Sequence, residues 1–171
     1  MILSPKEILD KGILTSPDLE LDLENQLQPN GIDIRVRDIQ RVQCNMHTPL
    51  KLWADGRKTV PDPYTCEMTI LDKEGNDAFV LNKGYAYSVE CFEMVKVPRG
   101  MVALVYGRST LHRNGVFCRA SVYDSGFHDH IGLMMFPFQD AWIEVGTRIA
   151  QIVFYQAKTA HLYKGQYGLK G

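Results

Sequence analysis

The chain has 171 residues, of which 45% are hydrophobic and 23% charged, with 19 Lys and Arg against 20 Asp and Glu. This length suits one folded domain and is too short to expect two, so we predict that residues 1–171 form a single domain. A net charge near zero provides no global field for nucleic acid or an acidic membrane, and neither is an expected partner. No apolar run reaches the roughly 20 residues of a membrane-spanning helix.

The four cysteines are scattered and form no C-x-x-C pair. This spacing argues against structural zinc or a disulfide framework and favours free thiols in a reducing cytoplasm. The N-terminal stretch mixes charged and apolar residues and has no signal-peptide core, so a cytoplasmic location is predicted. The H-x-E and P-C-x-x-C strings of zinc-dependent nucleobase deaminases are also missing, and zinc is not an expected cofactor.

The chain opens with a predicted short helix. Ser4 can cap it, Pro5 suits the first helical position, and Glu7 completes an S-x-x-E capping box. Gly12 sits where the helix could end. Residues 1–24 are therefore interpreted as an N-terminal helix followed by an acidic loop.

Most of the remaining chain is predicted to form short strands. Ile32, Ile34 and Val36 alternate with polar residues as in a strand, whereas prolines favour loop or edge structure between residues 46 and 66. The later strand-like runs are separated by Gly, Asp, Asn and Pro: EMTIL, AFVLN, AYSVECFEMVKV, MVALVYG, VFCRASVY, HIGLMMF, AWIEV and RIAQIVFY. One helical turn over residues 109–115 interrupts them. The pattern predicts a mainly β fold, either an antiparallel sandwich or a jelly roll.

The segment GRSTLHRNG follows an apolar strand and carries several groups that could bind an anion. A helix start presents free backbone N–H groups, and Arg108 and Arg113 could hold phosphate oxygens. Ser109 and Thr110 add hydroxyl donors. The alternative is a solvated basic turn in which Ser109 is only the helix N-cap.

The segment VYDSGFHDHIG places Asp124 in a turn after a strand. Its carboxylate could orient and deprotonate a water molecule, or it could only form the turn. Phe127 could stack on a sugar face or belong to the core. His128 and His130 would share one face of a strand, but no third metal ligand is apparent, which favours surface histidines.

Two later segments complete the candidates. Arg148 and Gln151 are polar groups within an apolar run, where each would be either a partner in a structural network or a ligand contact. The glycine-rich end, residues 160–171, is either a frayed tail or a segment that closes over a ligand.

Taken in order, these segments resemble the motifs of the dUTPase and dCTP deaminase superfamily. QPNGIDIRV is similar to Q-P-x-x-x-D-x-R, GRSTLHRNGV to G-R-S-S-L-A-R-x-G, and VYDSGFHDHI to I-D-P-G-W-x-G-x-I. GTRIAQIVF is similar to G-x-x-I-x-Q-x-x-F, YKGQYG to Y-x-G-Q-x-G, and MILSPKEI to the opening of the deaminase branch. The resemblance implies a jelly roll or distorted β-barrel that assembles as a homotrimer, with active sites built from neighbouring subunits and Mg²⁺ carried on a triphosphate.

The resemblance also implies roles for individual residues. Asp33 would support the sugar or a metal-bound water, Phe127 would pack against deoxyribose and help exclude a 2′-hydroxyl, and the backbone near Ala120 would read the pyrimidine edge. One group of residues would hold the phosphate chain: Arg108, Ser109, Thr110, Arg113 and, at the α-phosphate, Gln151. Another group would close the lid: Tyr163, Lys164 and Gln166.

One side chain separates the two reactions of the superfamily. The deaminase branch uses a glutamate in a stretch like L-E-F-Y-N, whereas this chain reads GLMMFPF and has Met134 at that place. A thioether cannot shuttle protons. The resemblance then implies a dUTP diphosphatase, in which water oriented by Asp124 attacks the α-phosphorus of dUTP and yields dUMP and pyrophosphate with Mg²⁺. The alternatives are a dCTP deaminase with another proton carrier and a non-catalytic, nucleotide-binding regulatory trimer.

Overall fold

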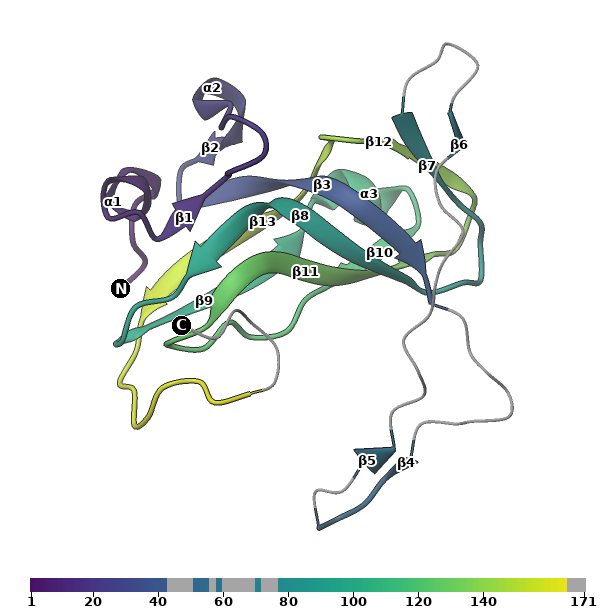
Figure 1. Cartoon of the computed structure of the whole chain (residues 1–171). Coiled ribbons are helices and arrows are strands. Elements are labelled where there is room, and N and C mark those ends of the chain that lie inside the picture. Colours follow the sequence, from purple (N-terminus) through teal and green to yellow (C-terminus); the bar gives the residue numbers. More distant parts are fainter. Residues whose placement is uncertain (43–50, 56–57, 60–69, 72–76, 166–171) are drawn as a thin grey trace.

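A computed structural model describes residues 1–42, 51–55, 58–59, 70–71 and 77–165, and its main feature is a closed barrel (Figure 1). Every neighbouring pair of barrel strands is antiparallel, and the pairing of β3 with β8 joins the two ends of the sheet. In the closed barrel each of these strands therefore pairs with a neighbour on both sides, although β9 and β10 share only the pair of Tyr106 with Arg119. In spatial order the strands are β8 (Tyr87–Lys96), β11 (His128–Pro137), β10 (Val116–Arg119), β9 (Met101–Gly107), β13 (Arg148–Gln156) and β3 (Gly31–Arg41).

Short elements decorate this barrel. The two-residue strands β1 (Leu14–Thr15) and β2 (Leu27–Gln28) extend the sheet next to β8 and β3. A separate small sheet contains β12 (Ala141–Glu144), β7 (Asp77–Leu81) and β6 (Ile70–Leu71), and β4 (Lys51–Leu52) pairs with β5 (Lys58–Thr59). The mainly β prediction is confirmed. No helix within the described residues is long and apolar enough to cross a membrane.

The N-terminal helix α1 (Pro5–Asp10) forms as its sequence predicts. The Ser4 hydroxyl accepts a hydrogen bond from the Glu7 N–H at 3.3 Å, and the Ser4 N–H donates to the Glu7 carboxylate at 3.1 Å. Beyond the helix Gly12 has φ +60°, and the Ile13 N–H donates to the Ile8 carbonyl at 3.0 Å. This is the left-handed glycine ending expected at Gly12.

A second short helix, α2 (Leu23–Gln26), lies where the sequence predicted an acidic loop. The Asp22 carboxylate caps it by accepting from the Asn25 N–H at 3.2 Å and from the Asn25 side-chain amide at 2.8 Å. In Figure 1, α1 and α2 lie on one side of the barrel, away from the small sheet of β6, β7 and β12.

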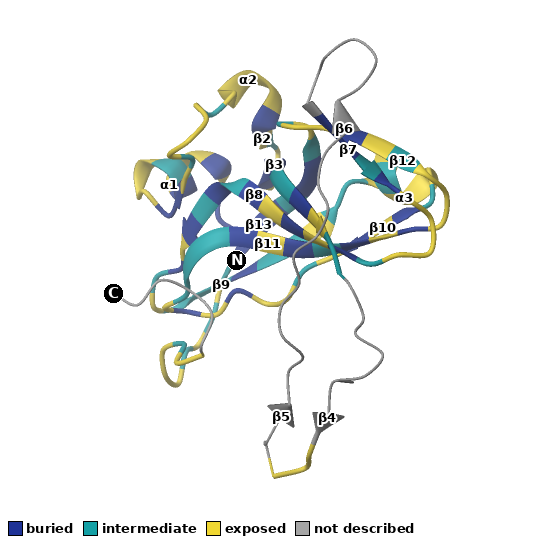
Figure 2. Ribbon diagram, turned by 45° about the vertical axis from the view of Figure 1, so that its right-hand side comes forward, coloured by how far each residue is buried: buried dark blue, intermediate teal, exposed yellow. Residues whose placement is uncertain are grey.

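Strand β3 is buried on both faces over its first half, which positions the candidate site. Ile32, Ile34 and Val36 point into the core, and the alternate residues Asp33 and Arg35 are also buried, at 3% and 6% exposure. Because successive side chains of a strand point to opposite faces, these two polar residues lie on the outer face of β3. Figure 2 shows the buried and exposed positions alternating along the barrel strands.

Some predicted strand boundaries differ from the structure. The run VFCRASVY was expected to be one strand, but β10 ends at Arg119 and the chain then leaves it. Tyr123 instead pairs with Ala103 across two backbone hydrogen bonds of 3.0 Å, which fixes the following turn beside the start of β9. The first three residues of EMTIL and most of the 46–66 stretch lie outside the described residues.

Candidate functional site

Three of the sequence motifs meet at one end of β13. Gln151 pairs with Asp33 of β3 on one side of β13 and with Tyr106 of β9 on the other side. Arg108 follows β9 directly, and its Nε atom is 3.5 Å from Asp33 Oδ2. Closure of the barrel therefore brings Asp33, Arg108 and Gln151 together, although they are far apart in the sequence.

The short helix α3 (Ser109–Arg113) continues from this cluster. The interpretation of Ser109 as N-cap is wrong: Arg108 occupies the cap position with extended backbone angles and forms no side-chain cap hydrogen bond. The cause is the pairing with β13, because the Arg108 N–H donates to the Ile149 carbonyl at 3.0 Å and holds Arg108 outside the helix. Ser109 and Thr110 are consequently exposed in the first turn, and Arg113 is exposed at the end of the helix.

Asp33 is the buried anion of this cluster. Its side chain is 5% exposed, and Oδ2 lies 3.4 Å from the Nη1 atom of Arg148 as well as 3.5 Å from Arg108. Burial raises the pKa of Asp33 above its ordinary value, because a charged carboxylate loses hydration there, while the charges of Arg108 and Arg148 oppose this increase. The ionised carboxylate therefore depends on the two arginines.

The turn that carries Asp124 is built by local hydrogen bonds. The Phe127 N–H donates to the Asp124 carbonyl at 3.0 Å, and the Ser125 hydroxyl donates to the Met101 carbonyl at 2.5 Å. Gly126 has φ +93°, a conformation that strongly favours glycine. These contacts leave the Asp124 side chain exposed, free to contact a ligand or water.

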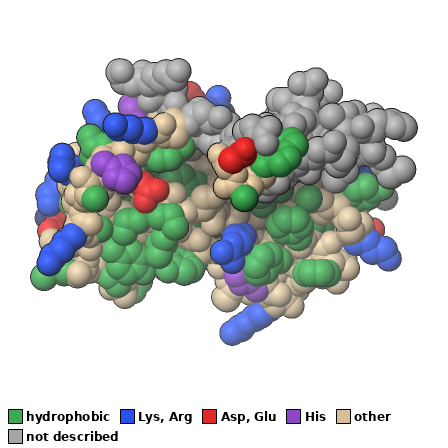
Figure 3. Space-filling model, turned by 90° about the horizontal axis from the view of Figure 1, so that it is seen from below, with side chains coloured by type: hydrophobic (Ala, Val, Ile, Leu, Met, Phe, Trp, Pro, Cys, Tyr) green, Lys and Arg blue, Asp and Glu red, His purple; other side chains and the backbone are tan. Residues whose placement is uncertain are grey.

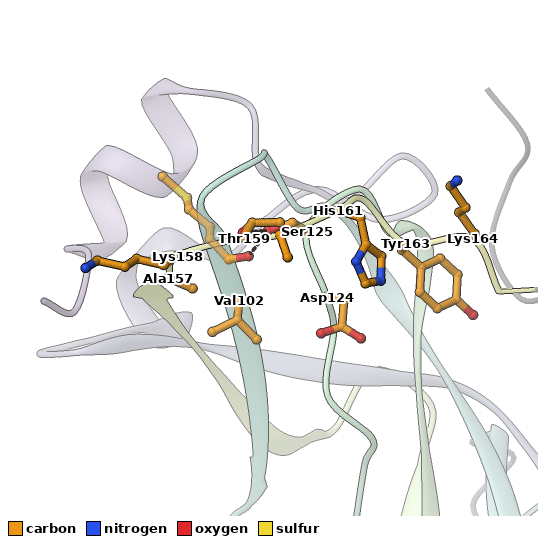
Figure 4. A pocket seen from close by; sticks show the side chains of 11 residues that line it. Val102, Asp124, Ser125, Ala157, Lys158, Thr159, His161, Tyr163 and Lys164 are labelled. Atoms are coloured by element: carbon orange, nitrogen blue, oxygen red, sulfur yellow. Dashed lines mark hydrogen bonds between the residues drawn. The ribbon is translucent and has the colours of Figure 1, made fainter.

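Asp124 borders a cavity of about 400 Å³ that it shares with the C-terminal segment (Figure 4). The Tyr163 N–H donates to the Ser125 carbonyl at 2.7 Å, and the Phe127 and Tyr163 rings meet edge to face with centroids 5.6 Å apart. Tyr163 and Lys164 both line the cavity. Gln166, the third predicted lid residue, lies outside the described residues.

A second cavity, of about 420 Å³, lies beside the paired strands β10 and β11 and is lined by both Ala120 and Met134. Met134 is opposite Arg119 in the strand register. Among the described residues, no carboxylate or imidazole borders this cavity. The Tyr123 hydroxyl accepts a hydrogen bond from the Gly132 N–H at 2.9 Å, and this bond connects the residue before Asp124 to the wall of the cavity.

The Asp124 turn and the Arg108 cluster lie apart within one chain. Tyr123 pairs with Ala103 near the start of β9, whereas Arg108 follows the end of that strand. At about 3.3 Å per residue, the strand between Ala103 and Arg108 covers roughly 16 Å. One chain therefore does not bring the predicted water-activating carboxylate next to the predicted phosphate-binding arginine.

The two candidate histidines have separate surroundings. His130 Nδ1 is 3.0 Å from the Cys91 carbonyl, and its Nε2 is 3.1 Å from Arg37 Nη1. His128 lies opposite Lys96 in the β11–β8 register. Within the described residues no group of three or more His, Cys, Asp or Glu side chains could hold a metal ion.

Sequence reasoning left the function of Arg148 open and did not identify Asn25. The Arg148 guanidinium donates from Nη1 to the Asn25 carbonyl as well as contacting Asp33, and the Arg148 carbonyl accepts from Arg108 Nη1 at 3.1 Å. A polar residue in an apolar run indicated that Arg148 needed a partner, but no pattern in the sequence indicated helix α2 as that partner.

Charge on the visible face below the barrel is dispersed. Figure 3 shows hydrophobic side chains over much of this face, with Lys, Arg and His side chains standing between them rather than forming one continuous basic surface. On this face an anionic ligand would therefore meet individual cations at particular places.

Fold and candidate site together define an antiparallel β-barrel protein with an arginine-flanked carboxylate beyond one end of β9 and an exposed carboxylate in a turn beside the other end. The sequence profile of the dCTP deaminase-like family matches residues 2–157, and the chain belongs to that family.

Similar curated proteins span nearly the same length. A probable deoxyuridine 5′-triphosphate nucleotidohydrolase of Halobacterium salinarum is 27% identical over 158 residues, 92% of both chains. One of Methanopyrus kandleri is 30% identical over 154 residues, covering 89% of this chain and 92% of the relative. The deoxyuridine 5′-triphosphate nucleotidohydrolase of Methanocaldococcus jannaschii is 28% identical over 145 residues, covering 84% and 88%.

A solved structure shares the fold. The 2′-deoxycytidine 5′-triphosphate deaminase from Agrobacterium tumefaciens superposes with a TM-score of 0.63 at 22% identity. The match covers 90% of this chain and 47% of that longer chain, so this chain spans about half its length.

Proposed function

We propose that this protein is a dUTP diphosphatase that hydrolyses dUTP to dUMP and pyrophosphate. The observation that carries the proposal is the cavity beside Ala120, where Met134 occupies the place of the deaminase glutamate and no described carboxylate or imidazole can replace it. Deamination requires proton transfer at the base, which a thioether cannot perform. Full-length relatives named as dUTP nucleotidohydrolases support the same reaction.

In the proposed reaction, each cluster of residues has a distinct role. Asp124 orients a water molecule and accepts its proton as the oxygen attacks the α-phosphorus, and the exposure of its side chain supports this role. Arg108 and Gln151 hold the phosphate chain, assisted by the hydroxyls of Ser109 and Thr110 and by Arg113. The base lies in the cavity beside Ala120, Phe127 packs against the sugar, and Tyr163 and Lys164 help cover the substrate.

Magnesium fits this arrangement when the substrate supplies most of its ligands. The described residues contain no group of three candidate ligands, and Asp33 Oδ2 is already shared by two arginines. Mg²⁺ would be held mainly by phosphate oxygens, with Asp33 in reach only through a water. The bound ion would neutralise charge on the triphosphate.

A homotrimer with shared active sites would explain why Asp124 and Arg108 lie apart within one chain. Asp124 and Arg108 stand at opposite ends of β9, so neither residue completes a site alone. In a closed ring of three subunits, the Asp124 turn of one subunit can face the Arg108 cluster of its neighbour.

Incubation of the purified protein with dUTP and Mg²⁺ is expected to release pyrophosphate, and Asp124→Asn should lower kcat by at least about 100-fold with little change in dUTP affinity. The matched control is Asp129→Asn, which removes a carboxylate five residues further along the chain that accepts from the His130 N–H at 2.8 Å, and it should leave kcat close to that of the wild type. Ammonia release from dCTP without hydrolysis of dUTP would instead identify a deaminase. Tight dUTP binding without any product would identify a regulatory trimer.

A further inference from the structure

Arg148 lies at the same carboxylate as Arg108. Its Nη1 atom is 3.4 Å from Asp33 Oδ2, and its side chain is 31% exposed, close to the 33% of Arg108. One buried carboxylate thus holds two guanidinium groups that both reach the surface. The two partly exposed guanidinium groups thus flank Asp33, which pairs with Gln151 in the strand register, and Arg108 leads directly into α3.

Arg148 retains unused hydrogen-bond donors in this position. A guanidinium has five N–H donors, and only Nη1 of Arg148 contacts other described residues, namely the Asn25 carbonyl and Asp33. Its Nε and Nη2 atoms form no hydrogen bond within the described part of the chain. The charge of Arg148 also contributes to lowering the pKa of Asp22, but the two Asp22 oxygens accept from the N–H groups of Asn25, which are the main cause of that lowering.

The buried network below α2 keeps Arg148 in place. Gln26 is fully buried, and its side-chain amide donates to the Asp33 carbonyl at 2.8 Å and to the Glu93 carboxylate at 2.9 Å. This anchors α2 to β3, and thereby fixes the Asn25 carbonyl that Arg148 contacts. An arginine whose geometry is fixed before binding loses less entropy when it binds an anion.

We propose that Arg148 is a substrate-binding residue that holds the phosphate chain together with Arg108, with Asp33 and the Asn25 carbonyl positioning its guanidinium. The inference rests on the proposed function for the identity of the triphosphate. A purely structural arginine would be satisfied by its protein partners, whereas Arg148 combines fixed geometry, exposure and free donors next to the other phosphate-binding candidates.

Binding of inorganic tripolyphosphate tests this role without requiring turnover. Arg148→Gln should weaken tripolyphosphate and dUTP binding by roughly 10- to 100-fold while leaving deoxyuridine binding unchanged, because one charge-assisted contact to phosphate is lost. Arg148→Lys should recover part of the loss, because it keeps the charge but not the planar fork. The matched control is Arg41→Gln, at the far end of β3, where the guanidinium lies 4.9 Å from the Tyr85 ring centroid; this change should leave both affinities unaltered.

A measurement on the wild type keeps the test independent of variant folding. Tripolyphosphate should slow the modification of Arg148 by phenylglyoxal, read by mass spectrometry, and deoxyuridine should not. Equal tripolyphosphate affinity in the wild type and Arg148→Gln, an equal loss of phosphate and nucleoside binding, or modification of Arg148 that tripolyphosphate does not slow would overturn the inference. A wild type that binds tripolyphosphate through Arg148 but never hydrolyses dUTP would instead contradict the proposed function alone.

Discussion

Asp33 couples the stability of the barrel to pH. Its folded-state pKa is raised because burial disfavours the charged form, and the arginines offset this only in part. A raised folded-state pKa means that the stabilising contribution of Asp33 is fully present below the unfolded-state value, and is lost as pH rises through the folded-state value. As pH rises from strongly acidic values, the wild type therefore loses a stabilising contribution that the neutral amide of Asn at position 33 would keep.

We expect the free energy of unfolding of Asp33→Asn to rise relative to that of the wild type as pH increases from strongly acidic values towards neutral. The ion pairs with Arg108 and Arg148 exist only while Asp33 is ionised, so their opposing effect is already part of its folded-state pKa. The prediction therefore concerns how the stability difference between the two proteins changes with pH. Urea denaturation at several pH values measures it, with Asp10→Asn as a control for the loss of an exposed carboxylate. A stability difference that stays flat or falls with pH would contradict the assignment.

At the scale of elements, Arg35 attaches the N-terminal segment to the barrel and is itself held by an ion pair with Glu93. The fully buried Glu93 carboxylate accepts from Arg35 Nε at 2.8 Å and from the Arg35 N–H at 2.7 Å. The Arg35 guanidinium also donates to the carbonyls of Leu19 and Glu20, both at 2.9 Å. One residue of β3 therefore fixes the chain that leads into α2.

Glu93→Ala is expected to lower the free energy of unfolding by about 3–5 kcal/mol, because it leaves a buried guanidinium without its partner. The double variant Arg35→Met with Glu93→Met should be clearly more stable than Glu93→Ala, because no buried charge remains. Urea denaturation of both variants distinguishes the cases. A Glu93→Ala protein as stable as the wild type would show that water, rather than Glu93, can satisfy Arg35.

The sequence was sufficient for elements whose signals are local. The capping box at Ser4 and the alternation of residues 32–36 predicted α1 and β3. The family resemblance implied a substrate contact for each of Asp33, Arg108 and Gln151, but it did not predict that these three residues lie side by side in one chain. Helix α2 escaped prediction because it is held by Gln26 and its buried long-range partners rather than by an apolar face. The separation of Asp124 from Arg108 could not be predicted from the sequence either, because it depends on where Tyr123 pairs with β9.

At the scale of the whole molecule, co-expression of two variants tests the proposed homotrimer and whether the two halves of the proposed site belong to different subunits. Asp124→Asn and Arg108→Ala should each be nearly inactive alone. Co-expressed in equal amounts, they should recover roughly a quarter of the wild-type activity, because a site is intact only where an Arg108→Ala subunit supplies Asp124 and an Asp124→Asn subunit supplies Arg108. Pyrophosphate release at limiting dUTP measures this, with the separately purified variants mixed without subunit exchange as the control. A site contained within one chain would give only the sum of the two variants, because each chain would then carry one defect in its own site and no neighbour could repair it.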